Sequence, residues 1–299
     1  YYGKDHLSYY SLSKKLRKEF KSNESFEIML NKLSCMKVSQ LNIFPIKSLG
    51  GISLNEAKTE ISGFKYDRNW MLVDKNGQFF TQRTLPKMAL LSVTIRGNSL
   101  FVYHRNKPQE EIEIPFDQTS GKKINSQVWN DPVKALHVSN EADRWFSAQL
   151  ETNCQLVKRD LDNKRHIESK YQVNDEHVSF ADSMPYLIIG QSSLDDLNKR
   201  LDIPLSMSRF RPNIVFSGGA PFVEDSWDEF QIGQTTFKVT KPCVRCVMTT
   251  INQKTAVKGK EPLRTLAKYR NVEGKILFGQ NLITLNEAKI SLGNPVITS

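Results

Sequence analysis

The sequence predicts a mixed α/β fold that is rich in β-strands, and three observations lead to that class. From Val38 onward, short apolar stretches alternate with turn-forming residues at close intervals, which is typical of β-barrels and sandwiches. Only a few segments repeat apolar residues at the spacing of an amphipathic helix. No apolar run reaches the ~20 residues that a membrane-spanning helix needs.

The individual elements follow from this pattern. We expect strands at residues 38–46, 52–54, 70–74, 79–83, 90–95, 100–104, 111–114, 186–189, 213–217 and 236–240. A helix is expected over residues 141–150, with Asn140 as its cap. Ser192 and Ser193 precede a second helix with acids in its first turn, and Pro262 begins a third.

The length of 299 residues suggests one large or two modest domains. We expect a first, strand-rich domain over residues 36–154 and a second domain over residues 155–299. Residues 1–35 lack the strand-like alternation that begins after Met36, and their charged residues argue against a secretory signal. They are therefore expected to be an N-terminal extension that is not native, with Met36 as the natural start.

Charge and cysteine content narrow the class of protein. The net charge is +10, but 32 acidic residues are interleaved with 42 basic ones, so a nucleic-acid-binding protein is not expected. The simplest interpretation of the charge is a generally basic surface with some positive pockets. The more specific alternative is a basic pocket that binds an anionic cofactor. Four unevenly spaced cysteines do not form a disulfide framework, which favours a reducing, cytoplasmic compartment.

The segment from Lys241 to Cys246 (K-P-C-V-R-C) follows a predicted strand and is expected to be a loop. Its C-x-x-C pair is compatible with half of a zinc site, a redox dithiol, or a single thiolate that binds a metal or cofactor. No second such pair supplies more zinc ligands, and residues 247–251 look extended rather than helical, unlike a thioredoxin-type site. The residues alone leave these uses open, although Lys241 and Arg245 would stabilise a thiolate.

Several short segments could bind an anion. Lys47 and Ser48 begin a K-S-x-G-G loop whose backbone donors suit phosphate, although a surface hairpin turn is the plainer interpretation. Arg68 and Arg211 each precede an apolar strand, where an arginine either contacts phosphate or is simply solvated. The Asp182-Ser183 pair could merely close a turn. The histidines are scattered, and none is spaced like a member of a catalytic triad.

Eight motifs occur in a fixed order: F-P-I-K-S, Y-D-R-x-W, F-A-D-S, F-R-P-N-I-V, D-x-W-D-E, P-C-x-R-C, E-P-L-x-T-L and F-G-Q-N. Together they resemble the MOSC family, in which an N-terminal β-barrel domain precedes the MOSC β-barrel domain with flanking helices. The resemblance extends from about Lys37 to Thr298. Within the family it is nearest to the mitochondrial amidoxime-reducing component and its bacterial YcbX-type relatives.

The resemblance implies a reductase of N-hydroxylated compounds that binds molybdenum cofactor, a metal–molybdopterin. It implies that Cys246 is the catalytic residue and the thiolate ligand of the metal, while Cys243 is structural or protective. The cofactor-binding residues that it implies are Lys47, Ser48, Arg68, Asp182, Ser183, Arg211, Asn213 and Asn281. At Asn281 this chain departs from the mitochondrial branch, which has an aromatic residue there.

The main alternative is the MOSC carrier domain of a molybdenum cofactor sulfurase, in which a pyridoxal-phosphate domain would precede the MOSC pair. The F-G-Q-N and E-P-L-x-T-L segments look more like the reductase branch. The expected partners are a small N-hydroxylated substrate and a separate electron donor of ferredoxin or cytochrome b5 type. No cysteine follows Cys246, so no iron–sulfur domain is expected within this chain.

Overall fold

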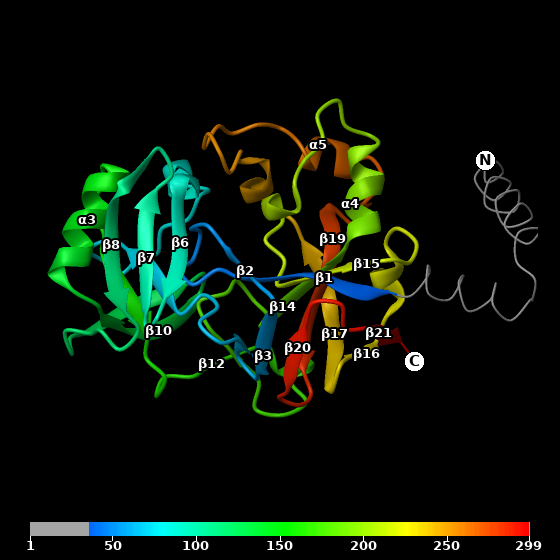
Figure 1. Cartoon of the computed structure of the whole chain (residues 1–299), viewed down its shortest axis with the longest axis horizontal. Helices are drawn as coiled ribbons and strands as arrows, with labels where there is room; N and C mark the ends of the chain where they lie inside the picture. Colours follow the sequence, from blue (N-terminus) through cyan, green and yellow to red (C-terminus); the bar gives the residue numbers. More distant parts are fainter. Residues whose placement is uncertain (1–35, 299) are drawn as a thin grey trace, which may run out of the picture.

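The computed structural model describes residues 36–298, and the expected N-terminal extension lies outside them. Figure 1 shows two lobes side by side, both built mainly from strands. One lobe contains a helix packed on a group of antiparallel strands, and the other is built around a larger sheet. The β-rich mixed fold predicted from the sequence is therefore confirmed.

The strands form one large and several small sheets. The large sheet has the order β2 (Ile52–Leu54), β1 (Lys37–Ile43), β15 (Ile214–Ser217), β14 (Tyr186–Gly190), β19 (Lys275–Thr284), β17 (Thr235–Val244), β16 (Glu229–Ile232) and β21 (Val296–Thr298), with β18 (Asn271–Val272) paired to β19. A four-stranded sheet has the order β5 (Trp70–Val73), β11 (Gln155–Arg159), β10 (Asp131–His137) and β9 (Lys123–Val128). Two three-stranded sheets have the orders β6 (Leu91–Arg96), β7 (Ser99–His104), β8 (Lys107–Pro115) and β20 (Lys289–Ser291), β3 (Glu56–Glu60), β4 (Gly63–Phe64). The strands β12 (Arg165–His166) and β13 (His177–Val178) form a two-stranded sheet.

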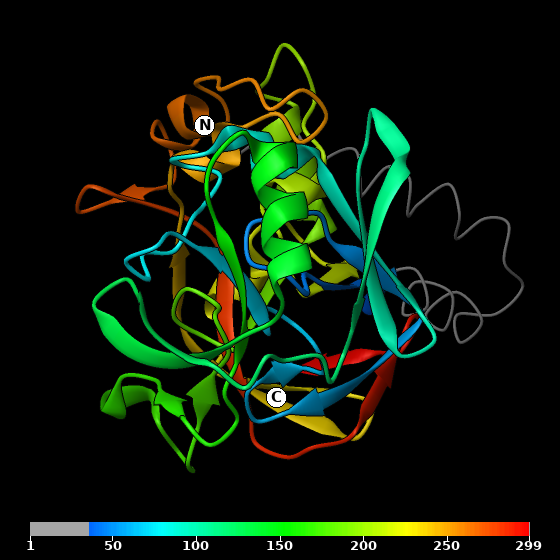
Figure 2. The ribbon, with the colours of Figure 1, turned by 90° about the vertical axis from the view of Figure 1, so that its left-hand side faces the viewer.

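The α-helices of the described residues are α3 (Asn140–Leu150), α4 (Gln191–Asn198) and α5 (Leu263–Leu266). Short 3-10 helices are η1 (Pro86–Leu90), η2 (Ser169–Tyr171), η3 (Met207–Arg209), η4 (Val223–Ser226) and η5 (Val247–Thr250). The long helix α3 packs against β8 and β11 and faces the viewer in Figure 2. Its cap is Ser139 rather than the predicted Asn140, because the Ser139 hydroxyl accepts a hydrogen bond from the Ala142 N–H.

The strand pairings connect the two halves of the sequence. The first strand, β1, pairs antiparallel with β15, with Leu41 opposite Ile214. The parallel neighbours β14 and β15 are joined through α4, as parallel strands require a crossover. Conversely, β11 pairs with β5 and β10 of the first lobe. The boundary expected between residues 154 and 155 stays a prediction. Strand β1, which precedes it, pairs with β15 of the second lobe, and β11, which follows it, pairs with strands of the first lobe.

Residues 79–83 were expected to form a strand but form a turn after an isolated bridge at Phe79. The carbonyl of Thr81 accepts hydrogen bonds from the backbone N–H groups of Thr84 and Leu85, which closes the chain on itself. Local bonds of this kind compete with the strand ladder that the apolar pattern favours. Most other expected strands are present, although the first ends at Ile43 rather than Ile46.

Residues 247–251 were also expected to be extended, but Val247–Thr250 form η5 and only Ile251 is extended. The hydroxyls of Thr249 and Thr250 donate to the carbonyls three residues earlier, at 3.0 Å and 2.8 Å. Threonine favours strands through its branched side chain, but a hydroxyl that bonds to the preceding turn stabilises a helical turn instead. The expectation was wrong because it took only side-chain shape into account.

Separate apolar clusters stabilise the two lobes. Trp70 and Phe146 lie in the core of the first lobe, and Tyr186, Phe216 and Phe237 lie in the core of the second. Both cores are fully buried and dominated by aromatic and branched side chains. Within residues 36–298, no helix is long and apolar enough to cross a membrane.

Candidate functional site

A cavity of about 460 Å³ gathers every residue that was predicted to bind the cofactor or its metal. The predicted residues that line it are Lys47, Ser48, Arg68, Asp182, Ser183, Arg211, Asn213, Cys246 and Asn281. They come from loops after β1, before β5, before β14 and before β15, from the turn after β17, and from β19. Because these segments lie far apart in the sequence, only the tertiary fold brings them together.

The cavity is strongly basic. Nine Lys or Arg residues line it against two acids, Glu168 and Asp182. Its volume falls within the range of about 300–1,000 Å³ that is usual for small-molecule and cofactor sites. Such an excess of positive charge in a concave site attracts an anionic ligand.

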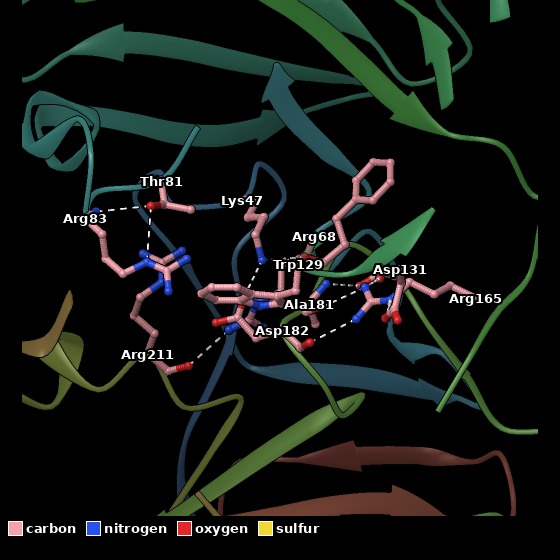
Figure 3. Close-up of polar contacts among 12 residues, drawn as sticks. Lys47, Arg68, Thr81, Arg83, Trp129, Asp131, Arg165, Ala181, Asp182 and Arg211 are labelled. Carbon is pink, nitrogen blue, oxygen red and sulfur yellow. Dashed lines mark hydrogen bonds and ion pairs between the residues drawn. The ribbon is translucent and has the colours of Figure 1, made fainter. Parts of the chain in front are cut away.

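Lys47 lines the cavity and is almost fully buried. Its ammonium group donates to the Phe180 carbonyl at 2.8 Å and to Asp182 Oδ1 at 2.5 Å. Burial lowers the pKa of Lys47, although Asp182 partly restores it. Figure 3 shows Lys47 on one side of the Asp182 loop and Arg165 on the other. Lys47 is therefore a cation held in place by the loop that it faces.

Arg68 and Arg211 form a second cationic group against a single aromatic ring. Their guanidinium carbons lie 4.7 Å and 4.1 Å from the centre of the Phe44 ring. Arg68 is paired with Asp67 and donates to Asn213 Oδ1 at 3.3 Å. The Asn213 side chain therefore orients Arg68 as well as lining the cavity, and the Phe44 ring packs against both guanidinium groups.

Arg211 has an unsatisfied donor in this cavity. Its Nη1 donates to the Leu49 carbonyl at 2.6 Å, but its Nη2 is buried without a hydrogen-bond partner within the described residues. Burial, reinforced by the nearby charge of Arg68, lowers the pKa of Arg211. An arginine nevertheless remains charged at neutral pH. A buried and unpaired charge is unfavourable by itself, so this guanidinium fits an anion that supplies the missing acceptor.

The backbone at these residues is strained. Ser48, Arg68 and Arg211 have positive φ angles of 68°, 51° and 55°. Residues other than glycine rarely adopt this backbone region, and each such residue destabilises the folded state by about 1–3 kcal/mol. Positions of this kind cluster at ligand-binding sites, and here all three belong to the predicted cofactor contacts.

The two cysteines of the C-x-x-C pair have different surroundings. The strand β17 continues to Val244, with Pro242 at a bulge, so the segment is not the simple loop that was predicted. Cys243 Sγ accepts a hydrogen bond from Arg245 Nη1 at 2.8 Å. Cys246 is exposed, and its Sγ has no hydrogen-bond partner within residues 36–298.

Of the two cations expected to stabilise a thiolate, Arg245 contacts a cysteine sulfur, whereas for Lys241 the expectation was wrong. Arg245 contacts Cys243 rather than Cys246, and Lys241 pairs with Glu168 at 2.6 Å. Arg245 follows Cys243 by two residues, a spacing that places both side chains on the same face of an extended chain. Cys246 lies beyond the strand end, at the start of η5, and its thiol is free for a ligand from the cavity.

The residues present fit molybdopterin. No group of three or more His, Cys, Asp or Glu side chains that could hold a metal alone exists in the described part of the chain. A metal here would therefore need most of its ligands from a cofactor, with one soft thiolate from Cys246. The unpaired Nη2 of Arg211 matches a phosphate oxygen. Asn281 donates from its Nδ2 to the Pro242 carbonyl at 3.4 Å. It therefore lies beside the segment Cys243–Cys246, which we call the cysteine turn.

Arg165 was not predicted from the sequence to belong to the site, but it holds the loop that carries Asp182. Its guanidinium donates to the carbonyls of Ser179 and Ala181 at 2.8 Å and to that of Asp182 at 2.9 Å, and pairs with Asp131 at 2.9 Å. It therefore holds the loop that contacts Lys47. Its motif, K-R-H, has no special spacing, so no signal in the sequence distinguishes it.

Replacing Arg165 with alanine is expected to destabilise the protein by about 3–5 kcal/mol, because three carbonyls of the loop lose a charged donor, at about 1–3 kcal/mol each. Urea unfolding of the purified variants measures this. Arg144→Ala, at an exposed position of α3, is the matched control and should unfold like the wild type. Equal stability of the two variants would contradict the supporting role of Arg165.

The Lys47–Asp182 pair makes stability depend on pH. Burial would raise the pKa of Asp182, but Lys47, helped by Arg83 and Arg68, outweighs it and holds the pKa well below its usual range. Because 54 % of the Asp182 side chain is exposed, the effect is partly screened. A depressed pKa means that the pair's stabilisation is present above about pH 4 and is lost as the pH falls through the lowered value.

We therefore expect the free energy of unfolding to fall more steeply below about pH 4 in the wild type than in Asp182→Asn, which has no titrating group there. Denaturant unfolding at pH 5, 4 and 3 measures the two slopes. Asp74→Asn, in a surface turn, is a control for the loss of a carboxylate elsewhere. Parallel slopes for wild type and Asp182→Asn would show that the pair does not stabilise the fold.

A second arrangement missed by the sequence involves a histidine. His137 lies between Ser120 and Asp143, with Nδ1 to Ser120 Oγ at 2.8 Å and Nε2 to Asp143 Oδ2 at 2.8 Å. None of the three residues lines the basic cavity. Asp143 also accepts from the Leu156 N–H at 2.8 Å, so the network ties α3 to β10 and β11.

Comparison with known proteins identifies the family to which this chain belongs. Residues 35–153 match the model of the MOSC N-terminal beta barrel domain, and residues 175–297 match that of the MOSC domain. The chain is a MOSC-domain protein. The resemblance inferred from the ordered motifs is therefore confirmed, including its relation to the amidoxime-reducing components.

The relatives of this MOSC-domain protein include amidoxime-reducing components and a molybdenum cofactor sulfurase. It is 32 % identical over 280 residues to mitochondrial amidoxime-reducing component 1 of Xenopus laevis, covering 87 % of this chain and 81 % of the relative. It is 34 % identical over 243 residues to mitochondrial amidoxime reducing component 2 of Homo sapiens, covering 78 % and 72 %. It is also 30 % identical over 289 residues to a molybdenum cofactor sulfurase of Solanum lycopersicum, covering 87 % of this chain but 35 % of that relative.

Proposed function

We propose that this MOSC-domain protein is a molybdenum-cofactor-dependent reductase of N-hydroxylated compounds such as amidoximes and hydroxylamines. The observation that supports it most is the convergence in one cavity of a free thiol at Cys246 with the buried cations Lys47 and Arg211. This set matches a cofactor that offers a metal at one end and a phosphate at the other. The relatives named amidoxime-reducing component match over most of both chains.

The residues divide into three roles. Lys47, Arg68 and Arg211 would hold the cofactor phosphate, for which planar guanidinium groups are well suited. Polar edges of the pterin would be met by Ser48, Asp182, Ser183, Asn213 and Asn281. Cys246 Sγ would bind the metal as a thiolate. When bound, the molybdenum centre supplies the two-electron reduction in which R–NH–OH and two protons become R–NH2 and water.

The remaining cavity wall would position the substrate. Tyr171, Met184 and Val244 present apolar surface beside the polar residues. Glu168 is held by Lys241 at 2.6 Å and by Lys170 at 3.0 Å, which fixes the charged edge of the cavity. An N-hydroxylated molecule would place its apolar part against the first group and its polar N–OH end toward Cys246.

A carrier function like that of a sulfurase is the second candidate, and the match to the tomato relative favours it. It ranks behind the reductase because that match spans only 35 % of the relative, whereas the amidoxime-reducing components are matched over 81 % and 72 %. We place the activity in the cytoplasm, since Cys154, Cys243 and Cys246 are all free thiols. A separate electron donor of ferredoxin or cytochrome b5 type is part of the proposal.

The deciding experiment loads the full chain with molybdenum cofactor and measures bound molybdenum and benzamidoxime reduction, with dithionite-reduced methyl viologen as electron source. We expect one molybdenum per chain and conversion of benzamidoxime to benzamidine. Protein that retains molybdenum but does not reduce benzamidoxime or hydroxylamines would contradict the reductase. Transfer of sulfur to the bound cofactor under the same conditions would instead favour the carrier.

A further inference from the structure

A second concave surface lies next to the cysteine turn. It encloses about 640 Å³ and is formed mainly by residues 250–268, with part of residues 200–209; we call it the basic groove. Its charged residues are Arg200, Asp202, Arg209, Lys258, Lys260, Glu261, Arg264 and Lys268. Six cations against two acids give it a positive potential, although no part of the proposed function uses it.

Much of this positive charge is not neutralised. Arg200 and Arg264 pair with Asp196 and Glu261. By contrast, Lys260 and Lys268 are exposed and have no carboxylate partner within residues 36–298. Unpaired charges of one sign in a single groove accelerate the association of an oppositely charged partner.

The groove also exposes apolar surface. Ile203 and Val257 line it with 78 % and 64 % of their surfaces open to solvent. Apolar side chains surrounded by unpaired charges are a usual composition for a protein–protein contact. Redox encounters are transient and use small interfaces, which bury less than about 1,200 Å² in total.

A short covalent and hydrogen-bonded path connects the groove to Cys246. Thr249 lines the basic cavity, and Thr250 lines the groove. The Cys246 carbonyl accepts from the Thr249 hydroxyl at 3.0 Å, and the Thr249 carbonyl accepts from Arg209 Nη1 at 3.3 Å. With a 3-10 rise of about 2 Å per residue, Thr250 follows Cys246 by about 8 Å along η5.

We infer that the basic groove is the docking surface for an acidic electron-transfer protein, an inference that rests on the proposed reductase function. Each turnover consumes two electrons that the substrate does not supply, so a reductant must deliver them near Cys246. An electron carrier that binds in the groove would be connected to Cys246 through η5. The basic cavity would then stay open to the substrate. Electrons and substrate then enter from different sides of the same turn.

The test is the double variant Lys260→Glu/Lys268→Glu of the cofactor-loaded full chain, assayed for benzamidoxime reduction with two acidic carriers. The carriers are a reduced [2Fe–2S] ferredoxin and the soluble haem domain of cytochrome b5. We expect the KM for the carrier to rise at least about 10-fold and its dependence on ionic strength to weaken. The rate with methyl viologen should not change, because neither lysine lines the basic cavity.

Lys75→Glu/Lys134→Glu is the matched control, since both lysines are exposed, lack a carboxylate partner among the described residues, and change the net charge equally. An equal rise of KM in both double variants, or no rise in either, would overturn the groove as docking surface. So would a wild-type protein that accepts electrons from methyl viologen but from neither carrier. Inactivity with methyl viologen would instead count against the reductase function itself.

Discussion

Cys246→Ser is expected to lose at least about 100-fold in molybdenum retention and in benzamidoxime reduction, while the protein stays folded. The lower bound follows from supporting residues around metal ligands, whose replacement already costs about 10- to 100-fold. Serine replaces a soft sulfur donor with a weakly acidic hydroxyl that is a poor ligand for a sulfur-rich metal site. Because Cys246 is exposed, its substitution leaves no cavity in the core. Metal analysis and circular dichroism of the same preparation separate lost binding from lost structure.

The matched control for this prediction is Cys243→Ser. Cys243 Sγ accepts a hydrogen bond from Arg245, and a serine hydroxyl can accept the same bond. This variant should therefore keep most of its molybdenum and activity. A result in which both cysteines matter equally would favour a dithiol, and survival of molybdenum in Cys246→Ser would refute the ligand assignment.

Arg211→Ala is expected to weaken the binding of inorganic phosphate and of the cofactor by about 30- to 150-fold, which corresponds to about 2–3 kcal/mol for charge-assisted hydrogen bonds. The unpaired Nη2 and the place of Arg211 beside Arg68 and Phe44 are the reasons for this large effect. Arg211→Lys keeps the charge but not the planar pair of donors, so an intermediate loss is expected. Calorimetric titration of the apoprotein with phosphate and molybdenum retention after gel filtration measure both.

Arg144→Ala provides the control for phosphate binding, because Arg144 is exposed on α3 and does not line the cavity. It should bind phosphate as the wild type does. Unchanged affinity in Arg211→Ala would remove Arg211 from the phosphate site and leave Lys47 and Arg68 to be tested in the same way. A drop in both variants would indicate a general effect of surface charge rather than a site.

The sequence by itself determined the fold class, most strands and the family. Alternation of apolar and polar residues is a local property, so strands such as β2 and β7 were found close to their observed bounds. The turn at residues 79–83 and the helix η5 were not, because backbone and hydroxyl hydrogen bonds outweighed the apolar pattern there. The ordered motifs determined the family because eight of them in one order are specific, although each alone is weak.

Only the tertiary structure decided how the site is organised. The assembly of Lys47, Arg211 and Cys246 in one cavity depends on pairings such as β1 with β15, which join residues far apart in the chain. The partner of Arg245, the support by Arg165 and the basic groove likewise depend on which side chains the fold brings into contact. Contacts of this kind form between distant segments, and spacing along the sequence carries no information about them. Patterns along the chain determine local structure, whereas the sheet register determines which distant side chains share a cavity.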